Sequence, residues 1–203
     1  MRAQSRCWIP LVAATAVVFV TSSCGAGKTR DTRLAAEKIE EATVELSVGD
    51  PLVAHELLAE AAELDPRAPG LHLLQGDTFL VMERLAEAEA AYRLAIEEAP
   101  GDPMPRNNLG VVYREQGHTG EAKRVFEEVV STLGPDIDAE HNLGLIALDE
   151  ERWENAIALF EGVVERDEKF APAHYGLAIA YERVGRELDS KRSEWRFELH
   201  RAR

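Results

Sequence analysis

The chain has 203 residues, and its 37 acidic residues against 23 basic ones give a formal net charge of −14 at pH 7. A surface of this sign repels phosphate backbones and the sequence has no basic stripe, so we expect no nucleic-acid partner. The two cysteines, Cys7 and Cys24, both lie near the N-terminus, which excludes a disulfide framework and a cysteine metal site in the folded part.

The first 23 residues have the pattern of a secretory signal. Arg2 and Arg6 precede an apolar run over residues 8–20, and small residues follow directly before Cys24. A cysteine in this place resembles the bacterial lipoprotein signal, although that family usually has leucine where this sequence has Thr21. The resemblance implies a signal peptide over 1–23 and a lipid on Cys24. An ordinary cleaved signal and an uncleaved anchor are the alternatives.

Residues 24–31 are expected to form a tether between the lipid and the folded domain. Residues 24–29 read Cys-Gly-Ala-Gly-Lys-Thr, which resembles the end of a phosphate-binding loop. That motif needs a glycine five residues before Gly27, where this sequence has Ser22, and it also needs a parallel sheet. The chain downstream has no stretch with the pattern of a strand. We therefore expect no nucleotide and no other cofactor.

Small and large apolar residues recur every 34 residues from about residue 35 to residue 184. Three series carry this period: Gly76, Gly110 and Gly144; Ala54, Ala88, Ala122 and Ala156; and Leu58, Tyr92, Phe126 and Phe160. Each unit reads as two helices, and Gly110 and Ala122 are small enough to mark where two helices approach most closely. The pattern resembles the tetratricopeptide repeat, a solenoid of helix pairs.

This resemblance implies an all-α, right-handed α-solenoid of antiparallel helix pairs over residues 32–203. The full repeats span about 35–68, 69–102, 103–136 and 137–170, and a partial, capping unit spans 171–203. The helices are predicted at 33–48, 51–64, 69–83, 85–98, 103–116, 119–132, 137–150, 153–166, 171–184 and 187–200. Asp50 is predicted to cap the second helix, with Pro51 at its first position.

The last predicted helix differs from the other second helices of the repeats. Ser190 and Glu194 occupy the slots of the small and aromatic residues, which is typical of a cap over the exposed end of a core. Trp195 and Leu199 are expected to pack inward. Residues 183–203 hold seven bases and four acids, so this polar cap has the alternative of contacting an anionic lipid or an acidic partner.

The sequence contains no constellation that supports catalysis. Its six histidines never pair at helical metal-ligand spacing, and no serine lies in a Gly-x-Ser-x-Gly turn. The carboxylates lie mostly on outer helix faces, where solvation is the ordinary state. We therefore expect a protein that is not an enzyme, with no metal ion and no small-molecule substrate.

In the family that this chain resembles, the first helices of successive units line a groove that takes extended or helical peptides. Mapping those slots onto this sequence predicts a partner-binding groove of Leu73, Asp77, Leu80, Asn107, Asn108, Val111, Arg114, His141, Asn142, Leu145, Tyr175, Ile179 and Glu182. Asn108 and Asn142 occupy equivalent slots. Because an amide both donates and accepts hydrogen bonds, a ladder of two would suit the backbone of a partner.

These observations favour a lipid-anchored scaffold of the bacterial cell envelope that binds protein or peptide partners. We expect it at the outer membrane, on the periplasmic face. The resemblance suggests a role in assembling an envelope machine such as a type IV pilus. The alternative is an accessory, non-catalytic subunit of an envelope enzyme complex, such as one for peptidoglycan or outer-membrane protein assembly.

Overall fold

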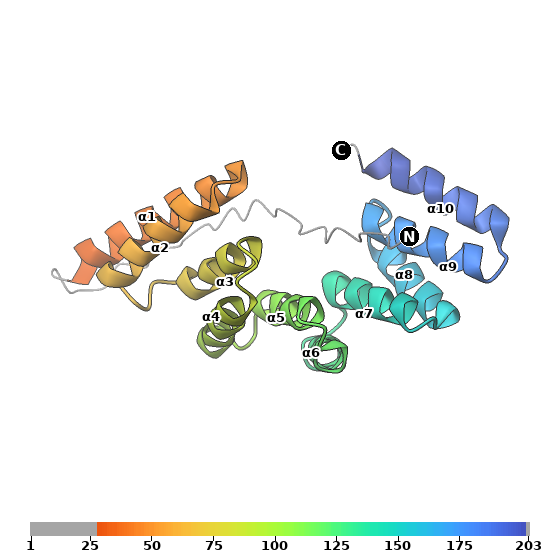
Figure 1. Cartoon of the computed structure of the whole chain (residues 1–203), viewed down its shortest axis with the longest axis horizontal. Coiled ribbons are helices and arrows are strands. Elements are labelled where there is room, and N and C mark those ends of the chain that lie inside the picture. The colour runs from red at the N-terminus through yellow and green to blue at the C-terminus, as the bar shows by residue number, and fades with distance from the viewer. Residues whose placement is uncertain (1–27, 202–203) are drawn as a thin grey trace. The chain divides into compact units, whose positions relative to one another are not determined.

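A computed structural model describes residues 28–201, and all regular structure in that range is α-helical (Figure 1). The expected signal peptide, Cys24 and the start of the expected tether lie outside the described residues. The chain divides after Glu83 into two compact units. The prediction of an all-α fold built from helix pairs is confirmed.

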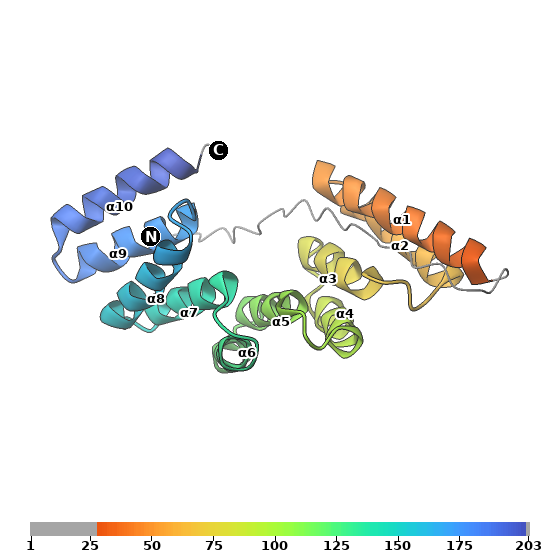
Figure 2. The same ribbon diagram turned by 180° about the vertical axis from the view of Figure 1, so that it is seen from behind.

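The first unit consists of α1 (Lys28–Val48), α2 (Pro51–Leu64) and α3 (Leu71–Val81). The helices α1 and α2 lie along each other in both views of the chain (Figures 1 and 2). Helix α1 begins before the predicted start at residue 33. The core of this unit is rich in alanine, which lets the helices approach closely, and two leucines complete it. Its buried members are Ala35, Ala42, Ala54, Leu58, Ala61, Ala68 and Leu71.

The second unit holds α4 (Leu85–Glu98), α5 (Pro103–Glu115), α6 (Thr119–Thr132), α7 (Ile137–Asp149), α8 (Trp153–Arg166), α9 (Ala171–Arg183) and α10 (Glu187–His200). Consecutive helices contact each other, and the first helices α5, α7 and α9 also contact one another in turn. The bounds of α2, α4, α6, α8 and α10 are those predicted from the sequence. The other helices inside the repeats differ at one or both ends by at most two residues.

Aspartate side chains start three of these helices. The Asp50 carboxylate accepts a hydrogen bond from the Val53 N–H at 3.2 Å, as predicted, and Pro51 follows it. Asp102 and Asp136 cap α5 and α7 in the same way. Each carboxylate satisfies a backbone donor that the first turn of a helix leaves unpaired.

The turn inside each helix pair uses one backbone conformation at one repeat slot. Gly117 has φ +80°, and Glu151, which lies 34 residues later, has φ 56°. Positive φ costs an ordinary side chain roughly 1–2 kcal/mol, while glycine adopts it freely. The geometry of the repeat therefore sets this turn, even where the local residue disfavours it.

Aromatic rings of the second helices pack directly on glycines of the first helices. A Cβ atom added at Gly110 would lie 2.6 Å from Cε1 of Phe126, whose side chain is fully buried. The close approach predicted at Gly110 is therefore present, and its nearest contacts are atoms of the Phe126 ring. Phe160 packs in the same way on Gly144 and also on Gly176, so one ring joins α7, α8 and α9.

Helix α10 covers the end of the second unit through small polar residues. Ser190 is buried, and its hydroxyl donates a hydrogen bond to the Ala178 carbonyl at 3.0 Å. The expectation that Trp195 and Leu199 pack inward is wrong, because 63% of Trp195 and 40% of Leu199 are exposed. Phe197 faces α9 instead, with its ring centroid 5.2 Å from that of Tyr175.

The contact between the Phe126 ring and Gly110 predicts that one added methyl group lowers the stability of the protein. Gly110→Ala should lower the free energy of unfolding by about 1–3 kcal/mol, because the buried Phe126 ring has no space to move into. Gly120→Ala is the matched control, since nothing lies within 4 Å of its Cβ position. We expect it to change stability by less than about 1 kcal/mol. Urea unfolding followed by circular dichroism measures both, and equal effects would contradict the packing described here.

Candidate functional site

The predicted groove residues of the first unit lie on one face of α3. Leu73, Asp77 and Leu80 are four and three residues apart, so their side chains follow one another along the helix. All three are half-buried. Their neighbour Leu74 packs against the alanine-rich core described above, which fixes the orientation of this face.

Asn107 does not line an accessible groove, which corrects the prediction for this residue. Its side chain is only 5% exposed, and its Nδ2 donates a hydrogen bond to Oδ1 of Asp136 at 2.8 Å. The same oxygen accepts the backbone N–H of Ala139 at the start of α7. Asn107 therefore ties α5 to the cap of α7. Its Nδ2 is satisfied by this contact, while its Oδ1 is buried and has no hydrogen-bond partner among the described residues.

The other predicted residues of the second unit keep exposed surface and form what we call the first-helix face. They occupy equivalent slots on three helices that contact in turn, α5, α7 and α9. The members of the first-helix face are Asn108, Val111, Arg114, His141, Asn142, Leu145, Tyr175, Ile179 and Glu182.

A hydrogen bond crosses the first-helix face between α5 and α7. Arg114 Nη1 donates to Oδ1 of Asn142 at 3.1 Å, and Nδ2 of Asn142 donates to the Asp138 carbonyl at 2.8 Å. An amide has two donor hydrogens and two acceptor lone pairs, so Asn142 retains one of each. The side chain is thus held in place while part of its hydrogen-bonding capacity faces outward.

His141 is buried beside two aromatic rings, and this burial keeps it neutral at physiological pH. Its ring centroid is 5.6 Å from that of Phe160 and 5.3 Å from that of Phe170. Burial, with a smaller contribution from the positive charge of Arg114, lowers the pKa of His141 to about 4. Only Arg114 and Glu182 therefore carry charge on the first-helix face, although the chain as a whole is strongly acidic.

On α9, the first-helix face is more exposed and more apolar. Tyr175 is 53% exposed and rests on Phe197 of α10, and Ile179 lies one turn further along the same helix. With Leu145 and Val111 on the neighbouring helices, these side chains give the face an apolar centre. Amide and charged groups border it, which is the composition of an interaction surface.

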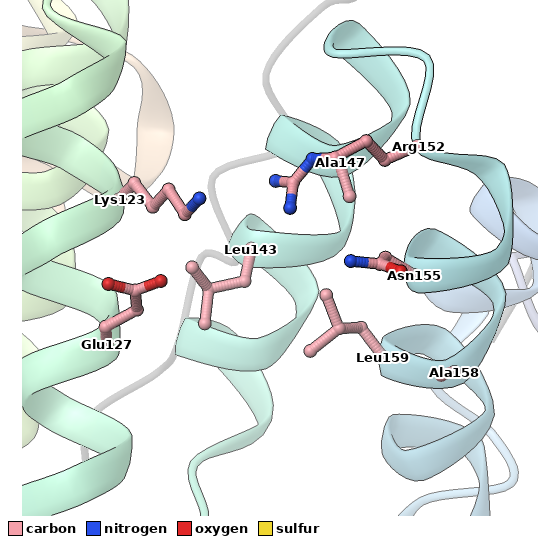
Figure 3. A pocket seen from close by; sticks show the side chains of 8 residues that line it. All are labelled: Lys123, Glu127, Leu143, Ala147, Arg152, Asn155, Ala158 and Leu159. Atoms are coloured by element: carbon pink, nitrogen blue, oxygen red, sulfur yellow. The ribbon is translucent and has the colours of Figure 1, made fainter.

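A pocket of about 340 Å³ opens elsewhere, between α6, α7 and α8 (Figure 3). It lies on the opposite side of α7 from His141 and Leu145, because each helical residue is turned by roughly 100° from the one before. Lining it are Lys123, Glu127, Leu143, Ala147, Arg152, Asn155, Ala158 and Leu159.

The sequence reasoning missed this pocket, although one signal for it was readable. Ala147 occupies the repeat slot that holds Phe79, Tyr113 and Tyr181 in other units. A small residue in a slot of large ones predicts missing volume, but the depth of the pocket depends on which neighbours surround it.

Within residues 28–201, no group of three or more histidine, cysteine or acidic side chains is placed to hold a metal ion. None of the described helices combines the length and the apolar character needed to cross a membrane.

Comparison with known proteins bears on this arrangement of helices. A family model of the tetratricopeptide repeat matches residues 29–103 and 141–189, and a second model of the same repeat matches residues 106–132. The chain belongs to the tetratricopeptide-repeat family. Proteins built from such repeats are generally non-catalytic scaffolds, and their folds commonly bind protein or peptide partners.

One curated protein aligns with this tetratricopeptide-repeat chain. It is the anaphase-promoting complex subunit CDC16 of Saccharomyces cerevisiae, which is 32% identical over 123 residues. The alignment covers 56% of this chain but only 15% of the yeast protein. The likeness therefore concerns the repeats and not the whole of the larger protein.

Several solved structures share the fold of this tetratricopeptide-repeat chain. PilF of Pseudomonas aeruginosa superposes with a TM-score of 0.74 at 21% identity, covering 84% of this chain and 78% of that one. PilW, a type IV pilus biogenesis factor, gives 0.72 at 18% identity, covering 83% and 78%. YrrB, a repeat protein with an unusual peptide-binding site, gives 0.58 at 20% identity, covering 86% and 94%.

The lowered pKa of His141 predicts a pH-dependent component of stability. Between pH 6.5 and about 4 the unfolded chain binds a proton that the folded chain does not, so stability is lost as the pH falls through this window. His141→Phe should remove this component, which reaches at most about 1.4 kcal/mol per pH unit. Urea unfolding of both proteins between pH 7 and pH 4.5 measures it, and parallel curves would contradict a buried, neutral His141.

Proposed function

We propose that this chain is a lipid-anchored scaffold of the bacterial cell envelope that binds a segment of a protein partner on the first-helix face. The observation that carries the proposal is the contrast between this face and the rest of the chain. The face is almost uncharged, with an apolar centre on α7 and α9, while the chain has a net charge of −14. Such a surface suits an extended or helical segment that carries little charge.

The hydrogen-bonding groups of the first-helix face support a peptide as the ligand. Asn142 is oriented by Arg114 and Asp138 and still has one donor and one acceptor for a partner. A side chain that is already oriented loses little conformational freedom on binding, which favours affinity. Apolar contacts with Leu145, Tyr175 and Ile179 would supply the remaining binding free energy.

The place of this scaffold in the cell is inferred from the N-terminal pattern and from the solved structures. We infer that Cys24 carries the lipid and holds the protein at the outer membrane, on the periplasmic face. The likeness to PilF and to the pilus biogenesis factor PilW supports a role in assembling a type IV pilus or a related envelope machine. In this role the chain binds and positions its partners and carries out no chemistry.

Replacing Asn108 and Asn142 together with Ala should weaken partner capture about tenfold, because up to two hydrogen bonds of about 1 kcal/mol each are lost. Helicity should be unchanged. The matched control replaces Glu97 and Glu165, which lie exposed on the outer faces of α4 and α8, with Ala. Crosslinking in envelope fractions, followed by quantification of each captured protein, compares the two variants. An identical set of partners at identical yield would overturn the role of the first-helix face.

The lipid anchor is tested separately. Cys24→Ser should move the protein from the membrane fraction to the soluble fraction and abolish its labelling by a radioactive fatty acid. Cys7→Ser is the matched control, since it removes the other cysteine of the chain and should leave both properties unchanged. Membrane association and label that persist in the Cys24 variant would refute lipidation at this residue.

A further inference from the structure

Tyrosines of two first helices reach across to the second helix of the preceding repeat. The Tyr113 hydroxyl of α5 accepts a hydrogen bond from Arg93 Nη2 of α4 at 2.9 Å. The Tyr181 hydroxyl of α9 donates to the Glu161 carboxylate of α8. In both pairs the tyrosine lies 20 residues after its partner, so the contact belongs to the repeat. Burial and Glu161 raise the pKa of Tyr181 to about 12, which keeps its hydroxyl protonated.

A second side chain, from the following turn, lies near the ring of each tyrosine. The Arg186 guanidinium lies 4.3 Å from the Tyr181 ring centroid, and the His118 ring lies 6.5 Å from that of Tyr113. Both side chains come five positions after their tyrosine, and Arg186 is the one that lies over the face of its ring. A cation over the face of a ring is attracted by the negative potential of that face.

In the unit of α7, residues with the chemistry of the Tyr181 partners are present, but the position of the tyrosine itself holds a small residue. Ala147 stands in the ring slot, Glu127 lies 20 residues before it and Arg152 lies five residues after it. Arg152 forms an ion pair with Glu150, but its Nε is buried and has no hydrogen-bond partner among the described residues. The side chains of Glu127, Lys123 and Asn155 form no hydrogen bond or ion pair within residues 28–201.

The missing ring leaves the pocket of about 340 Å³ that lies between α6, α7 and α8 (Figure 3). Leu143 and Leu159 form apolar walls, and the side chains of Glu127 and Arg152 approach from different sides. A cavity of roughly 150 Å³ is sufficient to hold a benzene molecule. The pocket is therefore large enough for a phenol ring that enters from solvent.

We propose that this pocket binds a tyrosine side chain presented by a protein partner. The partner's ring lies against Leu143 and Leu159 beneath the Arg152 guanidinium, and its hydroxyl donates a hydrogen bond to the Glu127 carboxylate. Glu127 thus accepts a hydrogen bond from the partner's tyrosine, as Glu161 accepts one from Tyr181. The pocket lies on the side of α7 that faces away from the first-helix face, so this inference does not depend on the function proposed above.

The carboxylate is what selects tyrosine over phenylalanine. A phenylalanine would bury its ring on the same leucines but would leave Glu127 with no donor. Hydrogen bonds to charged groups are the stronger ones, so the hydroxyl contributes appreciably to affinity. Tyr175 of a second copy is another source of the same side chain, and the experiment below separates it from a different protein.

The test uses p-cresol, the side-chain analogue of tyrosine, and toluene, which lacks the hydroxyl. In the ¹⁵N-labelled full chain, p-cresol should shift the amide resonances of Lys123, Glu127, Leu143 and Leu159 and should bind about tenfold more tightly than toluene. Ala147→Tyr should abolish these shifts and raise the midpoint of thermal unfolding, because the chain's own ring then fills the pocket. Ala90→Tyr, at an exposed position of α4, is the matched control and should leave the titration unchanged.

A second variant keeps the proposal testable if Ala147→Tyr fails to fold. Glu127→Leu should equalise the affinities for p-cresol and toluene, and the variant lacking the amides of Asn108 and Asn142 should titrate like the wild type. The absence of p-cresol shifts at the pocket, or an unchanged preference for p-cresol in Glu127→Leu, overturns the proposal. Self-association that Tyr175→Phe abolishes would assign the bound tyrosine to a second copy and overturn its assignment to another protein.

Discussion

The packing of an aromatic ring on a glycine is the contact on which the rest of the second unit depends. Phe126 lies on Gly110 inside one helix pair, and Phe160 lies on Gly144 of its own pair and on Gly176 of the next. A ring that touches the backbone on two sides fixes how far apart α7 and α9 lie. It fixes the spacing of the slots that face outward as well, because those slots are carried by the same two helices. The packing of the Phe160 ring therefore sets the spacing of any surface that extends across α7 and α9.

The repeat slots divide the chain into positions that build the architecture and positions that do not. Glycine, alanine and aromatic residues that recur every 34 positions occupy the inward faces of the helices. The residue types at the remaining positions are free to differ between repeats. On the first-helix face these positions became nearly uncharged, partly because burial beside Phe160 and Phe170 keeps His141 neutral. The acidity of the chain is then concentrated elsewhere. Such an acidic exterior and a nearly uncharged face give the two sides of the second unit different electrostatic properties.

Much of the fold could be predicted from the sequence, because its signals are local and repeated. Asp50 before Pro51 indicates where α2 begins, and the small residues that recur every 34 positions indicate how the helices pair. The site was harder to predict, because neighbouring residues of the same type differ in burial and in hydrogen bonding. Asn107 and Asn108 are adjacent asparagines, yet only Asn107 is buried and bonded to Asp136, the residue that caps α7. That partner lies 29 residues away, and no local pattern in the sequence connects the two.

The pocket beside Ala147 shows how a repeat protein tolerates an incomplete unit. Leaving out a buried aromatic ring forfeits about 1.5–3 kcal/mol of apolar burial. In a fold with one central core, such a loss would weaken the whole domain. In a solenoid, stability is close to a sum over units and their interfaces, so intact neighbours can absorb a local loss. Phe126 on one side and Phe160 on the other still pack on their glycines. An unfilled slot between two complete ones is thus a place where this fold can keep a binding pocket at little cost to its architecture.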